Sequence, residues 1–394
     1  MPIPNLADAQ AFMQSFAIDA WLVHDFRSSN PIFSALIPDG LGHLTRRVDL
    51  LIPARGEPTL ITSHIDSTFF QHIPFPVIKY LTWNEYHAAL RSALQGRPRI
   101  AMEYSPSGEL PVMGIVDGGT LELVRSFGSE VVSSADLIQT TIARWSADAA
   151  ATFEQSSREV AEVKDDAFAF IRDTLAAGKP LTEYMALERI HEGFRRRGLE
   201  WPDGPIVAAN AHAGDPHFEL TPSTSIPIVK GDWVLIDLWA RRPGNDNPFC
   251  DICWVGSCGT PTERQVKAFN IVKAAQHAAV DLAQSRWKSG KPARGWEVDD
   301  AAMAVLRASG MQSAIRHRTG HSLSRGAKVH GLGVNIDNTE THDTRHLLPG
   351  VGFTIEPGLY FDDFGVRLEI DVYVDPSTGP RVMTPIQQDI IRLA

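Results

Sequence analysis

Short apolar runs alternate with a helical pattern in the first third of the chain. The runs are rich in Val, Ile and Leu, which favour strands, and they occupy residues 20–23, 48–52, 59–61, 77–80 and 100–102. Residues 83–94 instead carry apolar positions at helical spacing. This alternation predicts a small α/β domain, and it contains no glycine-rich phosphate loop and no cluster of reactive side chains.

Longer amphipathic segments follow the first third. Residues 145–177 and 182–198 carry helical patterns, and the second opens on Thr182, a favoured N-cap residue. Beyond them the pattern predicts strands at 233–239 and 249–255, helices at 262–289 and 298–309, and final strands at 352–356 and 366–374. We therefore predict two domains, 1–144 and 145–394.

The composition is that of a globular protein with ample material for a core. Hydrophobic residues make up 43% of the 394 positions and charged residues 21%. Acidic residues number 47 against 37 Lys and Arg, a net charge of -10, and the longest basic run is Arg195–Arg197. Such a chain lacks the basic surface that nucleic acid requires, so we expect no nucleic-acid partner.

Nothing in the sequence indicates a membrane or an oxidising compartment. No stretch approaches the roughly 20 apolar residues of a membrane helix, and the first 16 residues lack the features of a secretory leader. Cys250, Cys253 and Cys258 are odd in number and closely spaced, which favours reduced thiols over a disulfide framework. We expect a cytoplasmic protein without a membrane partner.

Four carboxylates stand in predicted strands that are otherwise apolar. They are Asp237, Asp251, Glu356 and Glu369. A single case would be read as an ion-paired or edge carboxylate, because an unpaired buried carboxylate costs several kcal/mol. Four of them in one predicted domain repel one another and need cations to stay ionised at pH 7. The pattern indicates a site for divalent metal.

Histidines gather near the same region. Five lie between residues 317 and 346, most of them expected at structural or surface positions. His321 stands between Gly320 and Ser322, whose small side chains would let the imidazole reach a site. One imidazole and four carboxylates suit Mn(II), Co(II), Fe(II) or Zn(II). Five ligands fit two ions with bridging carboxylates, which would hold a hydroxide for attack on a carbonyl or phosphoryl group.

These candidates, in their order along the chain, resemble the ligands of the pita-bread metallopeptidases: prolidases, Xaa-Pro aminopeptidases and methionine aminopeptidases, with creatinase as a metal-free relative. The matching segments are Ile236-Asp-Leu, Cys250-Asp-Ile, Thr319-Gly-His-Ser-Leu, Phe353-Thr-Ile-Glu-Pro-Gly-Leu-Tyr360 and Gly365-Val-Arg-Leu-Glu369. The resemblance covers about residues 150–394 and extends loosely to the N-terminal part. It implies a small α/β, creatinase-type domain without catalytic residues over 1–144, and a pita-bread α+β catalytic domain over 145–394.

The resemblance also implies a ligand set and a reaction. The implied metal ligands are Asp237, Asp251, His321, Glu356 and Glu369. They would hold two divalent ions, manganese first, with cobalt, zinc or iron as alternatives. The implied reaction is hydrolysis of the peptide bond before proline, in dipeptides or at peptide N-termini. The implied partners are a small peptide substrate and a second copy of the chain in a homodimer.

Four residues receive further roles from the same resemblance. Glu356 would carry the proton to the leaving nitrogen. His217 and His330 would donate hydrogen bonds to the developing oxyanion or to the proline-side carbonyl, and each is otherwise a structural or surface histidine. Arg367, on the same strand face as Glu369, would orient carboxylates or bind substrate, with a plain salt bridge as the alternative.

Three features depart from the family pattern. Trp239 stands where relatives commonly have a small residue, on the strand face of Asp237, so it would narrow the site. Cys253 replaces a threonine whose hydroxyl supports a metal ligand, and a thiol is a weaker donor. The 14 positions from Asp237 to Asp251 are a few more than usual. A polar loop at 335–343 either sets specificity or is simply solvated, and we expect the second.

Two rival functions stay open. The same scaffold would serve an enzyme for another small substrate, such as a creatinase-like amidine hydrolase or a lyase. The five retained ligand types argue against the metal-free creatinase version, while Trp239 and Cys253 keep a different chemistry open. A non-catalytic binding protein with this fold would be expected to have lost a ligand, whereas all five ligand types are present.

Overall fold

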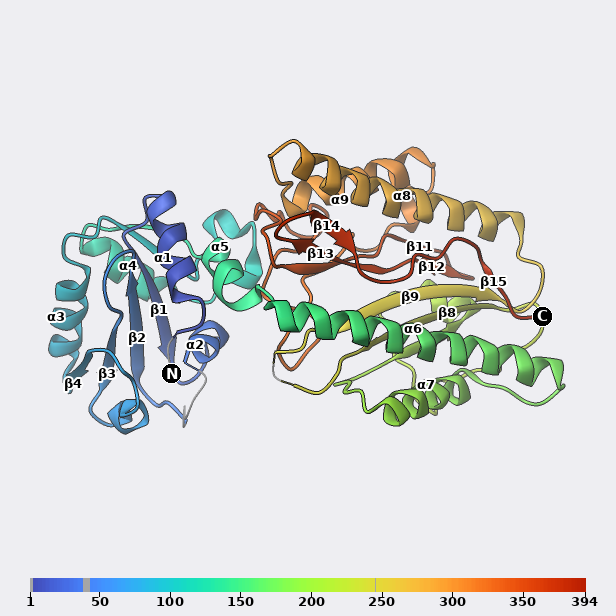
Figure 1. Ribbon diagram of the computed structural model, residues 1–394, viewed down its shortest axis with the longest axis horizontal. Coiled ribbons are helices and arrows are strands. Elements are labelled where there is room, and N and C mark those ends of the chain that lie inside the picture. The colour runs from blue at the N-terminus through green and yellow to red at the C-terminus, as the bar shows by residue number, and fades with distance from the viewer. Residues whose placement is uncertain (1–2, 38–42, 245) are drawn as a thin grey trace. The chain divides into compact units, whose positions relative to one another are not determined.

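The computed structural model describes residues 3–37, 43–244 and 246–394, and the chain divides into two compact units, Met1–Ile142 and Ala143–Ala394 (Figure 1). The sequence places the boundary two residues later, after residue 144. Each unit is described by itself.

The first unit is built on one six-stranded mixed sheet with the strand order β4-β3-β2-β1-β5-β6. Its strands are β1 (Ala20–Phe26), β2 (Arg47–Pro53), β3 (Thr59–Ser63), β4 (Val77–Tyr80), β5 (Arg99–Met102) and β6 (Glu130–Ser133). Its helices are α1 (Leu6–Ser15), α2 (Pro31–Leu36), α3 (Trp83–Leu94), α4 (Gly118–Ser126) and α5 (Ala135–Ile138). All five strands and the helix expected in this part are present, so the predicted α/β domain is confirmed.

Local sequence explains several helix ends in both units. Thr82 accepts a hydrogen bond from the Glu85 backbone N–H at 3.2 Å, and the Glu85 side chain accepts from the Thr82 N–H in return. Thr182 accepts from the Met185 N–H at 3.2 Å, as its predicted N-cap role requires. Gly198 closes that helix with a φ of 64°, a conformation that favours glycine.

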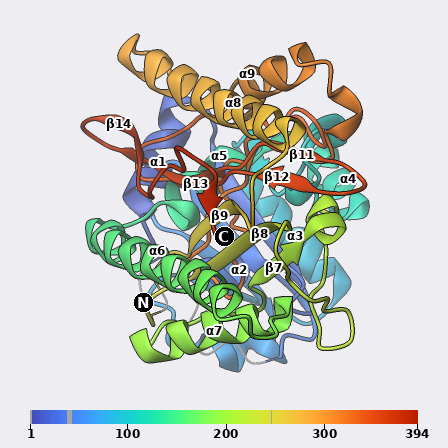
Figure 2. The same ribbon diagram turned by 90° about the vertical axis from the view of Figure 1, so that its right-hand side faces the viewer.

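The second unit places strands between two pairs of helices (Figure 2). One pair is α6 (Ala147–Ala176) and α7 (Glu183–Arg197), and the other is α8 (Glu263–Lys288) and α9 (Gly295–Ala308). A four-stranded sheet, in the order β15-β9-β8-β7, consists of β7 (Ile206–Ala209), β8 (Trp233–Ala240), β9 (Cys250–Ser257) and β15 (Ile391–Arg392). A three-stranded sheet contains β10 (Gly352–Ile355), β13 (Ile370–Asp375) and β14 (Gly379–Val382), and β11 (Gly358–Tyr360) pairs with β12 (Gly365–Arg367).

One predicted strand of this unit is wrong. The expected strand at 366–374 is broken after Arg367, and a new strand begins at Ile370. The backbone changes partner at the break: the Leu368 N–H donates to Pro357 and the Glu369 N–H donates to the Cys253 carbonyl at 3.1 Å. Hydrophobic alternation continues through the break, so periodicity alone does not reveal it. Within the described residues, no helix is both long enough and apolar enough to cross a bilayer.

Candidate metal centre

Two neighbouring strands present the first two candidate ligands on one face. In the antiparallel pairing of β8 with β9, Asp237 is opposite Cys253 and Trp239 is opposite Asp251. Opposed residues share a face of the sheet, and so do residues two apart on one strand. All four side chains therefore lie on the same face, as expected for Asp237 and Trp239.

The segment that carries His321 runs along β10. The Thr354 N–H donates to the His321 carbonyl at 2.8 Å, and the Glu356 N–H donates to Thr319 at 2.7 Å. Gly320 is required at this crossing, because a Cβ there would lie 2.1 Å from the Thr354 carbonyl oxygen. The close approach brings His321 beside Glu356, the residue that follows β10 directly.

The five candidate ligands converge on one small volume. Asp251, His321 and Glu369 each offer a ligand atom within 4.8 Å of the others. The His321 Nε2 atom lies 3.6 Å from Asp251 Oδ2 and 3.6 Å from Glu356 Oε1. Asp237 and Glu369 are both buried, and the charge of Asp237 is among the causes that raise the pKa of Glu369. The structure thus brings together all five predicted ligands.

Electrostatics inside this cluster favour a bound cation. Burial raises the pKa values of Asp237, Asp251 and Glu369, and the neighbouring carboxylates raise them further. Burial lowers the pKa of His321 to about 3, so its imidazole is neutral with a lone pair to offer. Among the described residues, the buried Asp237 Oδ1 and Asp251 Oδ1 have no hydrogen-bond partner. Divalent metal would satisfy these oxygens and offset the repulsion.

Arg367 is the one cation paired directly with a candidate ligand in the described contacts. Its guanidinium binds Asp237 and also donates to the Tyr360 hydroxyl at 2.9 Å. His317 Nε2 lies 2.7 Å from the same hydroxyl. The chain from His317 through Tyr360 and Arg367 to Asp237 fixes the orientation of that carboxylate.

Sequence reasoning missed three members of the site: His317, Tyr360 and Asp371. Asp371 is fully buried and accepts from the Asp251 backbone N–H at 2.9 Å, so it holds the strand that carries a ligand. Its position two residues after Glu369 was a usable signal, since it is a further carboxylate in an apolar strand. Tyr360 and His317 carried no comparable signal.

The two predicted substrate histidines differ in placement. The His330 ring packs on His321 with a centroid separation of 3.9 Å, and its side chain remains exposed to incoming molecules. His217 is exposed, and only its backbone N–H has a described hydrogen bond, to Asp215 at 3.0 Å. The structure therefore brings His330 to the cluster, and it shows no contact between His217 and the cluster among the described residues.

The polar loop at 335–343 is not a solvated loop, and that expectation is wrong. Asp337 and Asp343 are fully buried. Asp337 accepts backbone hydrogen bonds within the loop, and Asp343 binds the Arg345 guanidinium at 2.6 Å. Buried carboxylates that hold backbone N–H groups rigidify a loop, so the segment supports the His321 region.

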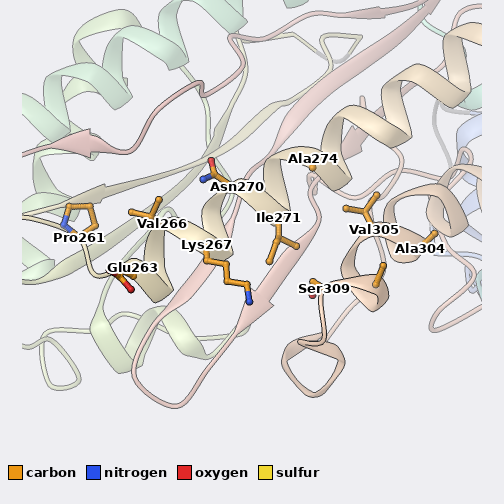
Figure 3. A pocket seen from close by; sticks show the side chains of 11 residues that line it. Pro261, Glu263, Val266, Lys267, Asn270, Ile271, Ala274, Ala304, Val305 and Ser309 are labelled. Carbon is orange, nitrogen blue, oxygen red and sulfur yellow. The ribbon is translucent and has the colours of Figure 1, made fainter.

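An apolar pocket of about 980 Å³ lies away from this cluster, between α8 and α9 (Figure 3). It is lined by side chains such as Val266, Ile271 and Val305, with Glu263 and Lys267 among them. It contains none of the candidate ligands, so the centre is defined by the carboxylate cluster and not by this pocket.

Comparison with known proteins identifies a family for this chain. The model of metallopeptidase family M24 matches residues 155–376, more than half of the chain. A putative dipeptidase of Bacillus subtilis, YkvY, is 27% identical over 56% of this chain and 56% of its own. The Xaa-Pro dipeptidase of Lactobacillus helveticus is 30% identical over 51% of this chain and 49% of its own. The matched region thus spans about half the length of these curated relatives.

A solved structure extends the likeness over the whole chain. Dipeptidase PepE from Mycobacterium ulcerans superposes with a TM-score of 0.71 at 22% identity, covering 99% of this chain and 97% of that one. At this identity the match shows the shared two-unit fold. The fold, with one imidazole among buried carboxylates, defines a metallohydrolase of the pita-bread type. The chain belongs to metallopeptidase family M24.

Proposed function

We propose that this protein hydrolyses the peptide bond before proline in short peptides, Xaa-Pro dipeptides first. The observation that carries the proposal is the buried set of Asp251, His321 and Glu369, with ligand atoms within 4.8 Å of one another. Asp237 and Glu356 complete a set suited to two divalent ions, manganese first and cobalt, zinc or iron as alternatives. Such ions, when bound, would supply Lewis acidity and a hydroxide at neutral pH.

The protein's own residues perform the other parts of the reaction. Glu356, whose side chain is 15% exposed, lies with Oε1 3.6 Å from His321 Nε2, and its assigned role is to take a proton and pass it to the leaving nitrogen. Thr354 donates a hydrogen bond to Glu356 Oε1 at 3.2 Å and orients it. His330 is proposed to donate to the oxyanion as the tetrahedral intermediate forms. His217 is proposed to contact the substrate from the exposed edge.

Arg367 is a positioning residue in this proposal. Its charge opposes the rise that burial causes in the pKa of Asp237, its hydrogen bond orients that carboxylate, and its contact with Tyr360 restrains the guanidinium in turn. The alternative role of substrate binding is disfavoured by its burial.

A second candidate is another small-substrate hydrolase or lyase on the same scaffold. It is favoured by one observation: Trp239 occupies the ligand face of β8, opposite Asp251. An indole at that position narrows the space available to a substrate.

The setting of the enzyme is proposed from the same features. The three cysteines are buried and unpaired, which supports a reducing compartment such as the cytoplasm. We propose a homodimer as the working assembly, with small peptides as its partners and neither nucleic acid nor membrane. Sedimentation velocity at micromolar concentration tests the dimer: a single monomer peak contradicts it.

The function is tested with Ala-Pro and Ala-Pro-Ala, each incubated with the Mn(II)-loaded protein and with a chelated sample. Release of proline from the dipeptide alone indicates a prolidase with a closed site, whereas release of alanine from both indicates an aminopeptidase. If metal is bound and neither peptide is cut, the peptidase proposal fails and the second candidate replaces it.

A further inference from the structure

A short loop before β7 is fastened beside the metal-ligand face of β8. At one end the Glu200 N–H donates to the Arg241 carbonyl at 2.8 Å, and the Arg241 N–H donates back at 3.0 Å. At the other end Ile206 pairs with Asp237 as β7 begins. The loop between these anchors runs along the part of β8 that contains Trp239.

Trp239 determines the conformation of this loop. Its indole Nε1–H donates to Asp203 Oδ1 at 3.0 Å. The ring packs so closely on Gly204 that a Cβ there would lie 2.3 Å from an indole carbon. His191 Nε2 donates to the Gly204 carbonyl at 3.0 Å from the other side. Asp203 is therefore held in a fixed place, although it is exposed.

Asp203 has no cationic partner within residues 3–37, 43–244 and 246–394. Among the described residues, no Lys, Arg or His forms an ion pair with it, and its Oδ2 accepts no hydrogen bond. The indole that holds Asp203 lies on the ligand face of the sheet, because Trp239 is opposite Asp251 in the pairing of β8 with β9. An anion without a described cationic partner is thus held beside the metal-ligand face.

The distance along β8 suits a long side chain. Trp239 is two residues from Asp237, roughly 7 Å along the strand, and Asp203 lies beyond its indole. A Lys or Arg side chain can pack its methylene stem on an aromatic ring while its charged group reaches a carboxylate. In an Xaa-Pro dipeptide the second residue carries no cation, so the long side chain must belong to the first residue.

We propose that Asp203, positioned by Trp239, is the subsite for a cationic side chain on the amino-terminal residue of the substrate. The inference rests on the proposed function and extends it: the favoured substrates are short peptides that begin with Lys or Arg. The indole, which departs from the family pattern, is then a specificity element and not an obstruction.

The test compares Lys-Pro with norleucyl-proline, which has a similar stem and no ammonium. The Mn(II)-loaded wild-type protein is expected to show a kcat/KM ratio about five- to tenfold in favour of Lys-Pro. Asp203→Asn should bring the ratio close to one, Asp203→Glu should restore part of it, and Trp239→Phe should lower it by releasing the carboxylate. Asp281→Asn, at an exposed position on α8, is the matched control and should keep the wild-type ratio.

If the preference for Lys-Pro is electrostatic, the kcat/KM ratio should depend on the salt concentration. Raising the salt concentration from about 0.05 M to about 0.5 M should lower the wild-type ratio and leave that of Asp203→Asn unchanged. Equal losses for both peptides in Asp203→Asn would mean that Asp203 holds the common α-ammonium, and would overturn the proposal. A wild-type ratio near one would overturn it too.

Failure of the peptidase function is distinguishable from failure of this subsite. Calorimetry on the same Mn(II)-loaded protein measures binding of the reduced-amide analogues of the two peptides, which are not hydrolysed. If neither dipeptide is cut, an analogue preference of about fivefold for lysine that Asp203→Asn removes still supports the subsite. Equal affinities overturn it.

Discussion

At the scale of single residues, Glu356 is the side chain on which the proposed chemistry depends most. Glu356→Gln keeps the shape but cannot shuttle a proton, so kcat for Ala-Pro should fall at least about 100-fold, or about 2.7 kcal/mol. The four remaining ligands, Asp237, Asp251, His321 and Glu369, should still retain at least one ion. Steady-state kinetics with elemental analysis measures both effects. Glu122→Gln, at an exposed position in the first unit, is the control, and turnover near the wild-type rate in Glu356→Gln would refute the assignment.

The variant Cys253→Thr tests whether the thiol at this position has a role of its own. It is opposite Asp237 on the sheet, and burial raises the pKa of its thiol against the opposing charge of Arg367. Because a threonine hydroxyl is a stronger hydrogen-bonding group, Cys253→Thr should bind Mn(II) with equal or lower Kd and keep its activity. Fluorescence-monitored metal titration measures this, with Cys258→Ala as a buried-thiol control. Loss of activity in Cys253→Thr alone would show that the thiol has a role that a hydroxyl at this position does not perform.

Sequence patterns located the ligands because charge in an apolar strand is conspicuous. Asp237, Asp251 and Glu369 stood out for that reason. Tyr360 and His317 did not, since a tyrosine or histidine in such a segment is ordinary until the fold brings it against Arg367. The roles of His217 and His330 stay predictions, and only His330 lies against the cluster.

At the scale of elements, the crossing of the His321 segment over β10 is a sensitive point. Gly320→Ala would force a Cβ to within 2.1 Å of the Thr354 carbonyl oxygen, which is rigid backbone. We expect a loss of about 2–4 kcal/mol in the free energy of unfolding and weaker Mn(II) binding, because His321 shifts. Urea unfolding and metal titration measure the two effects. Gly118→Ala, which has open space around it, should be close to neutral; equal losses in both variants would contradict the argument.

The pairing of β1 with β2 predicts a pH dependence in the first unit. His24 is buried opposite Asp49, with Nδ1 2.7 Å from Oδ1. Burial lowers the pKa of His24, but the charge and hydrogen bond of Asp49 outweigh it, so the net pKa is raised above 6.5. The stabilisation is therefore fully present below pH 6.5 and lost as pH rises through the raised pKa.

Hydrogen exchange of β1 and β2 amides between pH 5.5 and about pH 8.5, corrected for intrinsic rates, measures that effect. His24→Asn should remove the slope, whereas His72→Asn, at an exposed position in the same unit, should keep it. A slope of opposite sign in the wild-type protein would contradict the pairing.

Element prediction succeeded where one face of a segment is buried and failed where tertiary contacts end an element. Apart from the strand at 366–374, the predicted strands and helices of both units are confirmed, including the Thr182 cap. The break between Arg367 and Ile370 was not predictable, because it follows from the Glu369 N–H turning to the Cys253 carbonyl, and the local sequence does not encode that partner.

At the scale of the whole molecule, metal should stabilise only the second unit. Mn(II) at about 100 times its Kd adds about 2.7 kcal/mol to the unit that binds it. Amide exchange should slow in β8 and β9 on adding Mn(II), stay unchanged in β1 and β2, and return to its original rate on chelation. Asp251→Asn should lose most of the protection. Equal protection of both units would contradict a site confined to the second.

The most direct test of the account is a titration of the metal-depleted protein with Mn(II), with Ala-Pro hydrolysis followed at each addition. We predict a rate that rises with added metal and levels off at about two equivalents, as a five-ligand site for two ions requires. Hydrolysis that needs no metal and survives a chelator, or its absence at every metal concentration, would contradict the account.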